Sequence, residues 1–168
     1  MMLGRGLAVA AAAAMLDQAS KAMVLAFFGE PGCAVHRVAV SWFLDLVLTC
    51  NPGVSFGLFN RTGVNSLIFS AAALSIIIGL CFWLGRVRAT FLAVAIGLVI
   101  GGAIGNVVDR LRFGGVIDFL DFHIGTWHWP AFNLADSAIC LGVAAMLLDG
   151  ILSRRAAPQA TRREDLSP

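Results

Sequence analysis

The chain has 168 residues, of which 59% are hydrophobic and only 13% are charged. A soluble domain has about 45–50% apolar and about 25% charged residues. This composition excludes a disordered chain, a nucleic-acid-binding domain and an ordinary soluble enzyme. Because one membrane helix needs about 20 residues, the chain is long enough for a single domain with four membrane spans.

Four apolar stretches are each long enough to cross a bilayer as a helix. Asp17 and Lys21 interrupt the first stretch and Asp136 interrupts the fourth, whereas the central parts of the second and third carry no charge. The predicted spans are residues 6–28, 64–86, 89–109 and 131–152. They form one membrane domain, residues 1–152, and we expect the polar tail 153–168 to be disordered.

The positions of the basic residues predict how the chain is oriented. Because basic residues favour the cytoplasmic side, we place both termini and the loop between the second and third spans in the cytoplasm. Loops 29–63 and 110–130 then face the opposite side. The larger, cytoplasmic set is Arg5, Arg86, Arg88, Arg154, Arg155, Arg162 and Arg163, and the opposite set is Arg37, Arg61, Arg110 and Arg112.

The first span has features of a cleaved signal peptide, namely Arg5 and an alanine-rich run from Ala10 to Ala14. However, the apolar core ahead of its Ala-x-Ala triplets is too short, and the apolar stretch continues to Phe28. We therefore expect this segment to remain as a membrane span.

The loop 29–63 has the composition of a small sheet. Residues 38–48 are rich in strand-forming and aromatic side chains, and an Asn-Pro-Gly turn signal follows them. We expect this sheet to lie at the outer membrane surface, with Trp42, Trp127 and Trp129 in an aromatic belt.

Two of the four cysteines, Cys33 and Cys50, fall in the same outer loop, and Cys81 and Cys140 fall within spans. A disulfide between the outer pair would require an oxidising compartment. We favour the alternative that both are small buried thiols. Their spacing does not match a zinc site.

Charged residues within a span need partners or a task, because a charge at the bilayer centre costs roughly 2.5–3.5 kcal/mol. Asp17 and Lys21 are four residues apart and share one helix face, so they can pair. A structural salt bridge and a contact with substrate are both open interpretations. At the end of the third span, Asn106, Asp109 and Arg110 cluster, and the adjacent Asp-Arg predicts a structural clamp.

Two further aspartates stand in apolar surroundings. Asp118 follows the turn 114–115, and Asp136 lies one turn into the fourth span with Asn133 on its face. If the two carboxyl groups share a location, one stays ionised and the other protonated. That arrangement lets an aspartyl protease activate water and protonate the leaving amine. Helix capping and proton relay are the alternative roles.

Residues 53–57 match the Gly-x-Ser-x-Gly nucleophile elbow, with Ser55 in the nucleophile position. That motif requires a strand, a turn and a helix within an α/β sheet, which this chain cannot form. We expect His123 and His128 to be interfacial hydrogen-bonding groups rather than metal ligands. Neither a His-Glu-x-x-His motif nor a phosphate-binding loop is present, so we expect no metal and no cofactor.

Five motifs occur in order over about residues 15–150. They are DQASK at 17–21, NPGVSFG at 51–57, GGAIGNVVDR at 101–110, VIDF at 116–119 and FNLADS at 132–137. Together they closely resemble the motifs of the lipoprotein signal peptidases, or signal peptidase II, of bacteria. That family has alanine at one or both of the positions that Val54 and Ser55 occupy here, which affects the expected details of the pocket.

The resemblance implies an enzyme that removes the signal peptide from diacylglyceryl-modified prolipoproteins, just before the lipidated cysteine. It implies an all-α integral membrane protein of four transmembrane helices, plus a small periplasmic β-sheet called the β-cradle. Asp118 and Asp136 are then the catalytic pair. The residues implied to bind substrate or to shape the site are Asp17, Lys21, Asn51, Gly53, Asn106, Asp109, Arg110, Asn133 and Ala135.

The same resemblance implies an enzyme of the bacterial inner membrane, in contact with lipids and with its site near the periplasmic face. We expect it to be a monomer. Two other classes compete with it. A transporter or proton-relay protein would use the same aspartates to carry charge, but the chain shows no inverted repeat. A purely structural membrane protein leaves the clustering of Asp109, Asp118 and Asp136 unexplained. Cleavage activity distinguishes the enzyme from both.

Overall fold

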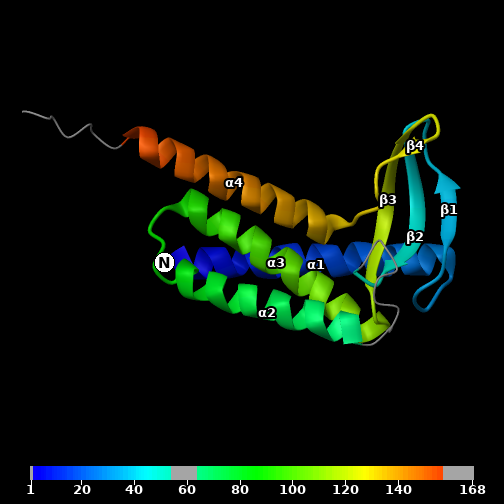
Figure 1. Cartoon of the computed structure of the whole chain (residues 1–168), viewed down its shortest axis with the longest axis horizontal. Helices are drawn as coiled ribbons and strands as arrows, with labels where there is room; N and C mark the ends of the chain where they lie inside the picture. The colour runs from blue at the N-terminus through cyan, green and yellow to red at the C-terminus, as the bar shows by residue number, and fades with distance from the viewer. Residues whose placement is uncertain (1, 54–63, 157–168) are drawn as a thin grey trace, which may run out of the picture.

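Four long helices and a small antiparallel sheet make up the chain in the computed structural model, which describes residues 2–53 and 64–156 (Figure 1). The helices are α1 (Met2–Phe28), α2 (Val64–Leu84), α3 (Thr90–Phe113) and α4 (Leu134–Ala156). The strands are β1 (His36–Ala39), β2 (Leu44–Asn51), β3 (Val116–Ile124) and β4 (Trp127–His128). The start of α1, the α2–α3 connection and the end of α4 lie at one end of the molecule, and the sheet lies at the other.

All four helices are long and apolar enough to cross a membrane. Many of their outward-facing side chains are large, apolar and exposed, including Met23, Ile68 and Phe82. Helices that remain apolar on their outward faces are typical of membrane spans, because lipid replaces water as their solvent. The four-span expectation therefore agrees with the helices that form.

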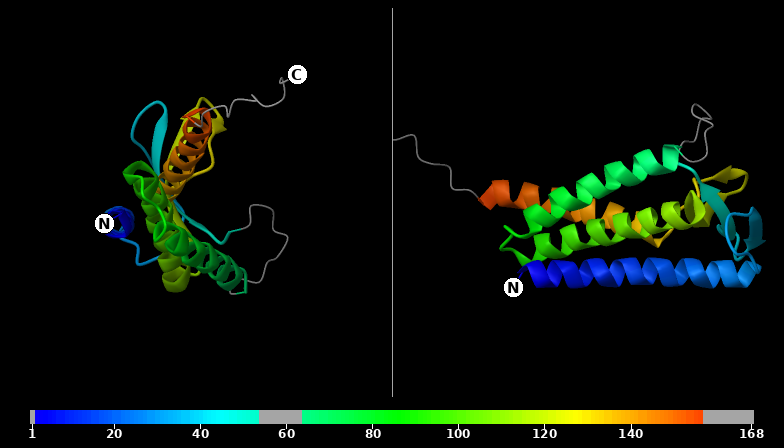
Figure 2. Two further views of the ribbon diagram at one scale, coloured as in Figure 1. Left: turned by 90° about the vertical axis from the view of Figure 1, so that its left-hand side faces the viewer. Right: turned by 90° about the horizontal axis from the view of Figure 1, so that it is seen from below.

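Helix α3 is the central helix and packs against α1, α2 and α4 (Figure 2). Small residues make this close packing possible. A side-chain carbon added at Gly101 would meet the backbone of Ala10 in α1, and one added at Gly102 would meet the carbonyl oxygen of Ala135 in α4. The packing brings the sheet-side ends of α1, α3 and α4 together.

The helix ends differ from the predicted spans. Helix α3 continues past the predicted end at residue 109, so Arg110 also lies within it. Helix α4 begins at Leu134 rather than at 131 and extends beyond residue 152. Residues 157–168 of the expected tail, which include Arg162 and Arg163, lie outside the described residues, as does Arg61.

The sheet has the strand order β1-β2-β3-β4, with every neighbouring pair antiparallel. The expected small sheet forms, and it extends further than loop 29–63 because β3 and β4 join it. The term all-α therefore does not describe the whole fold, which combines helices with a four-stranded sheet. Thr49 lies opposite Asp118, next to a bulge in β2 that follows Leu46. Bulges of this kind change the direction of side chains near functional sites.

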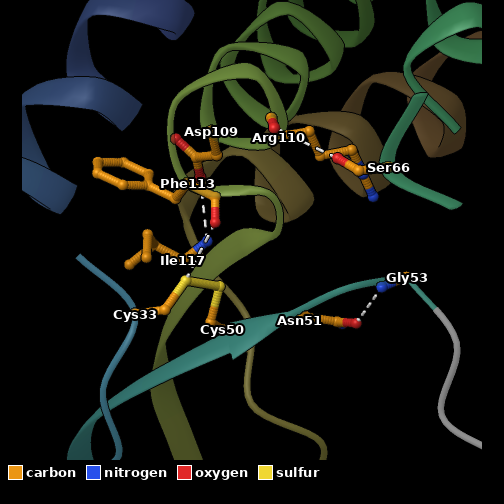
Figure 3. Close-up of a disulfide and its surroundings, with 9 residues drawn as sticks. All are labelled: Cys33, Cys50, Asn51, Gly53, Ser66, Asp109, Arg110, Phe113 and Ile117. Atoms are coloured by element: carbon orange, nitrogen blue, oxygen red, sulfur yellow. Dashed lines mark hydrogen bonds between the residues drawn. A yellow bond between two sulfur atoms is a disulfide. The ribbon is translucent and has the colours of Figure 1, made fainter. Parts of the chain in front are cut away.

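Cys33 and Cys50 form a disulfide, so the prediction of two buried thiols was wrong. The segment after α1 brings Cys33 to the end of β2, where its Cα atom lies 5.2 Å from that of Cys50 (Figure 3). This distance is within the range that a disulfide requires. The bond joins the α1–β1 connection to the residue that precedes Asn51.

Candidate active site

Residues from all five motifs meet at the sheet end of α3 and form one polar site. A dense group of buried polar side chains is costly in an apolar bundle unless each one is bonded. Asp136 is half-buried and Asn51 is exposed. The fully buried members are Asp17, Lys21, Asn106, Asp109, Asp118 and Asn133.

Two asparagine amides connect Asp118 and Asp136. Asn133 Nδ2 donates to Asp118 Oδ1 at 2.8 Å, and Asn133 Oδ1 accepts from the main-chain N–H of Asp136 at 2.9 Å. Asn106 Nδ2 donates to Asp136 Oδ1 at 2.9 Å, and Asn106 Oδ1 accepts from Asn133 Nδ2 at 3.3 Å. The two carboxyl groups therefore belong to one hydrogen-bond network, although β3 and α4 supply them separately.

Asp136 also caps helix α4. Asn133 immediately precedes the helix, and its own N–H donates to Asp136 Oδ2 at 3.3 Å while its side chain bonds the Asp136 N–H. This reciprocal pair is a capping box, which satisfies N–H groups that have no partner inside the helix. Helix capping, one of the alternative roles, is thus a role that Asp136 has in addition to its contact with Asn106.

Burial gives Asp118 an unusual proton affinity. It is 3% exposed, and burial raises its pKa from 3.8 to about 7, helped by the nearby charge of Asp136. Hydrogen bonds from Asn51 and Asn133 lower the pKa and partly oppose this rise. At neutral pH Asp118 therefore retains a proton for a large part of the time, as one member of a catalytic carboxyl pair must.

The expected Asp17–Lys21 ion pair is confirmed, and it includes a third residue. Lys21 Nζ lies 2.8 Å from Asp17 Oδ2 and 2.6 Å from Asp109 Oδ2. Gln18, which the sequence reasoning did not select, donates to Asp109 Oδ1 at 2.8 Å and to the Gly105 carbonyl at 3.2 Å. Its position three residues before Lys21, on the same helix face, was the available signal.

The expected clamp between Asp109 and Arg110 does not form among the described residues. Consecutive residues point in different directions on a helix, so Asp109 faces Lys21 while Arg110 turns away. Arg110 Nη1 donates to the Asn106 carbonyl at 3.2 Å, and the guanidinium carbon lies 5.9 Å from the centre of the Phe69 ring. Arg110 Nε is buried and has no hydrogen-bond partner in the described part of the chain.

The Asn-Pro-Gly motif begins at Asn51, the last residue of β2. Asn51 Oδ1 accepts from the Gly53 N–H at 2.9 Å. Gly53 has φ +98° and packs so closely on Phe69 that an added side chain would meet the ring. Val54 and Ser55, the two departures from the family pattern, lie outside the described residues.

A second charged cluster lies on the sheet and could be mistaken for a metal site. Asp45, Asp121 and His128 place their oxygen and nitrogen atoms close enough together to share one cation. Arg37 already supplies the positive charge, because its Nη1 lies 2.6 Å from Asp45 and its Nη2 lies 2.7 Å from Asp121. Burial raises the pKa of Asp45, but the bonds to Arg37 and His123 outweigh it and leave the pKa below its usual value. These contacts favour hydrogen-bonding roles for the histidines.

Helices of membrane length around paired carboxyl groups define the class of the protein. It is a multi-pass membrane protein with the groups that aspartic proteases use.

The family model for signal peptidase (SPase) II matches residues 9–152, and the chain belongs to that family. It is 41% identical over 156 residues to the lipoprotein signal peptidase of Methylorubrum extorquens (strain PA1), a match that covers 92% of this chain and 88% of that protein. It is 44% identical over 137 residues to the lipoprotein signal peptidase of Burkholderia cenocepacia (strain J2315), with 80% of each chain covered. The resemblance carried by the five motifs is therefore confirmed.

Two solved structures of bacterial membrane enzymes, both determined by the in meso method, have the same fold. One has a TM-score of 0.73 and 26% identity, and the match covers 96% of this chain and 95% of that chain. The other has a TM-score of 0.73 and 27% identity, with coverages of 88% and 93%.

Proposed function

We propose that the protein removes the signal peptide from diacylglyceryl-modified prolipoproteins by cutting just before the lipidated cysteine. Membership of the signal peptidase II family supports this function, as do relatives named lipoprotein signal peptidase. The observation that carries the mechanism is the network in which Asn133 and Asn106 join Asp118 to Asp136. A transporter or proton-relay protein is not favoured, because the matching family and relatives are peptidases.

In this mechanism the two aspartates share one proton, which Asp118 holds. Asp136 takes a proton from water as the water oxygen attacks the scissile carbonyl carbon, and Asp118 donates its proton to the carbonyl oxygen. When the C–N bond breaks, Asp136 passes its proton to the leaving amine. The hydroxyl group on the former carbonyl carbon then returns a proton to Asp118, which restores the starting state.

An apolar cavity of about 700 Å³ beside Asp136 suits a substrate that comes from the membrane. Phe132, Ile139 and Leu141 contribute to its lining. We place the apolar segment of the signal peptide in this cavity, because burial of apolar surface favours its binding there. Asp17, Lys21, Asn51, Gly53, Asn106, Asp109, Arg110, Asn133 and Ala135 shape the site around the catalytic pair.

We place the protein in the inner membrane as a monomer, with residues 1–152 as its membrane domain. Both termini are cytoplasmic and the sheet is periplasmic, because Arg5 and Arg86 lie at the end away from the sheet. The exposed Trp42 and Trp127 contact lipid headgroups. In right-side-out vesicles, an impermeant maleimide should label a Trp127→Cys variant more strongly than an Arg86→Cys variant, and the reverse would contradict the orientation.

The catalytic proposal is tested with purified protein in detergent and a diacylglyceryl-modified prolipoprotein, with release of the signal peptide followed by gel shift. The variants are Asp118→Asn and Asp136→Asn. The control is Asp121→Asn, which changes another buried aspartate of β3 that bonds to Arg37 instead.

We expect the wild type and the control to cleave and both dyad variants to be inactive. Cleavage by either dyad variant would reject the paired-aspartate mechanism. Failure of the folded wild type to cleave would reject the proposed function itself.

A further inference from the structure

The paired aspartates are attached to a buried ion triad, which consists of Asp17, Lys21 and Asp109. All three side chains are at most 2% exposed. Removing charges from water costs several kcal/mol per ion, unless close pairing and additional hydrogen bonds compensate. Besides their ion pairs with Lys21, the carboxylates of Asp17 and Asp109 make hydrogen bonds to the main chain. These bonds show which segments the triad holds in place.

On the α4 side, Asp17 Oδ1 accepts from the main-chain N–H of Ala135 at 2.9 Å. Ala135 directly precedes Asp136. This N–H belongs to the first turn of α4 and has no partner within the helix, and a carboxylate there also interacts favourably with the helix dipole. Since the Ala135 carbonyl packs directly on Gly102, the backbone before Asp136 has little room to move.

On the β3 side, Asp109 Oδ2 accepts from the main-chain N–H of Ile117 at 3.1 Å (Figure 3). Ile117 directly precedes Asp118. Its N–H is therefore bonded to α3, although the residue lies opposite Cys50 in the sheet. The same pattern thus occurs on both sides: a triad carboxylate holds the N–H of the residue before a catalytic aspartate.

We propose that Lys21 is a positioning residue that sets the relative placement of the two catalytic aspartates by tying Asp17 to Asp109. This proposal rests on the proposed function. Among the described residues, Lys21 contacts neither catalytic carboxyl group, and its remaining polar contact is Asn106 Oδ1 at 3.3 Å. Charge-assisted hydrogen bonds of this kind are short and strong. A misplacement of about 1 Å at a catalytic site can lower the rate about 100-fold.

A purely structural triad predicts a different result. Removing one partner of a buried ion cluster leaves uncompensated charge and lowers stability. If the triad is purely structural, Lys21→Met therefore has a lower Tm, and its folded fraction retains the wild-type kcat. Positioning instead requires the acceptor atoms. Asp17→Asn keeps an oxygen for the Ala135 N–H, whereas Asp17→Leu is close in size and lacks one.

The experiment measures kcat and KM for Lys21→Met, Asp17→Asn and Asp17→Leu. The control is Asp45→Leu, which breaks the ion pair in the sheet between the buried Asp45 and the exposed Arg37. We expect Lys21→Met and Asp17→Leu to lose at least about 100-fold in kcat with little change in KM, and Asp17→Asn to lose less than about tenfold. The control should have a lower Tm and a nearly unchanged kcat.

Hydrogen exchange of the Ile117 and Ala135 amides provides a readout that does not depend on cleavage. Both amides should exchange faster in Lys21→Met and remain unchanged in Asp45→Leu. Wild-type kcat or unchanged exchange in Lys21→Met would overturn the proposal, as would an equal loss of kcat in the control. If Asp17→Leu does not fold, Lys21→Met and Asp17→Asn decide. If the wild type does not cleave, the proposed function fails and the exchange data still test the attachment.

Discussion

Replacing Asp118 with asparagine should stabilise the folded protein while it abolishes cleavage. Asp118 has a pKa of about 7, against 3.8 for an ordinary aspartate, because burial and the charge of Asp136 disfavour its ionised form. In the unfolded chain this carboxyl group ionises freely above pH 3.8. Folding at pH 8 must therefore bury an unfavourable charge, which asparagine does not carry.

The size of the effect depends on pH. Because the folded-state pKa is raised, the stabilising contribution of Asp118 is complete below pH 3.8 and is lost as the pH rises to about 7. At about 1.36 kcal/mol per pKa unit, the cost is about 4 kcal/mol at pH 8 and about 1.6 kcal/mol at pH 5. For a chain of this length, the Tm of Asp118→Asn should rise by roughly 10 °C at pH 8 and by roughly 4 °C at pH 5.

Tryptophan fluorescence during heating in detergent measures this difference at both pH values. Asp121→Asn is the matched control, because Asp121 is buried on the same strand and bonds to Arg37. The control should have a lower Tm than the wild type. The reasoning is refuted if Asp118→Asn melts with the wild type at pH 8, or if its advantage is equally large at pH 5.

We expect three further outcomes. The value of kcat/KM should fall above pH about 7 as Asp118 loses its proton, and a pH profile that stays flat to pH 9 contradicts this. Replacing Cys33 and Cys50 with serine should lower the free energy of unfolding by about 3 kcal/mol, given the 17-residue separation, and reduced wild-type protein should match the variant in denaturant titrations. Gly102→Ala should lower the Tm because its side chain would meet the backbone of α4, whereas Gly79→Ala, at an open position, should not.

The helices could be predicted from the sequence because a long uncharged apolar run is a local signal. The Asp17–Lys21 pair could also be predicted from a local signal, because residues four apart share a helix face. The direction of the Arg110 side chain could not be predicted from the sequence. An adjacent Asp-Arg suggests a clamp, but helix geometry separates the two side chains, and Lys21 from another helix takes the contact with Asp109.

Contacts between distant segments could not be deduced from spacing. The Cys33–Cys50 bond depends on how the α1–β1 connection meets β2, and neither cysteine carries a local signal for that path. The bond from Asp17 to Ala135 joins the first and last helices and involves a main-chain N–H, to which residue identity gives no clue. The motifs therefore selected a set of candidate residues, and only the fold shows how these residues are connected.

The site contains two pairs of neighbouring aspartates, and the negative charge of each pair is neutralised in a different way. Asp17 and Asp109 share Lys21, whose charge is fixed in place by two short ion pairs. In the proposed mechanism Asp118 and Asp136 share a proton, which can move to the carbonyl oxygen of a substrate, whereas a lysine side chain cannot leave its helix. A carboxyl pair neutralised by lysine is suited to holding structure, and one neutralised by a proton is suited to chemistry. The position of the single lysine therefore distinguishes the pair that holds structure from the pair proposed to do chemistry. For this reason, replacing Lys21 should lower kcat and leave KM nearly unchanged.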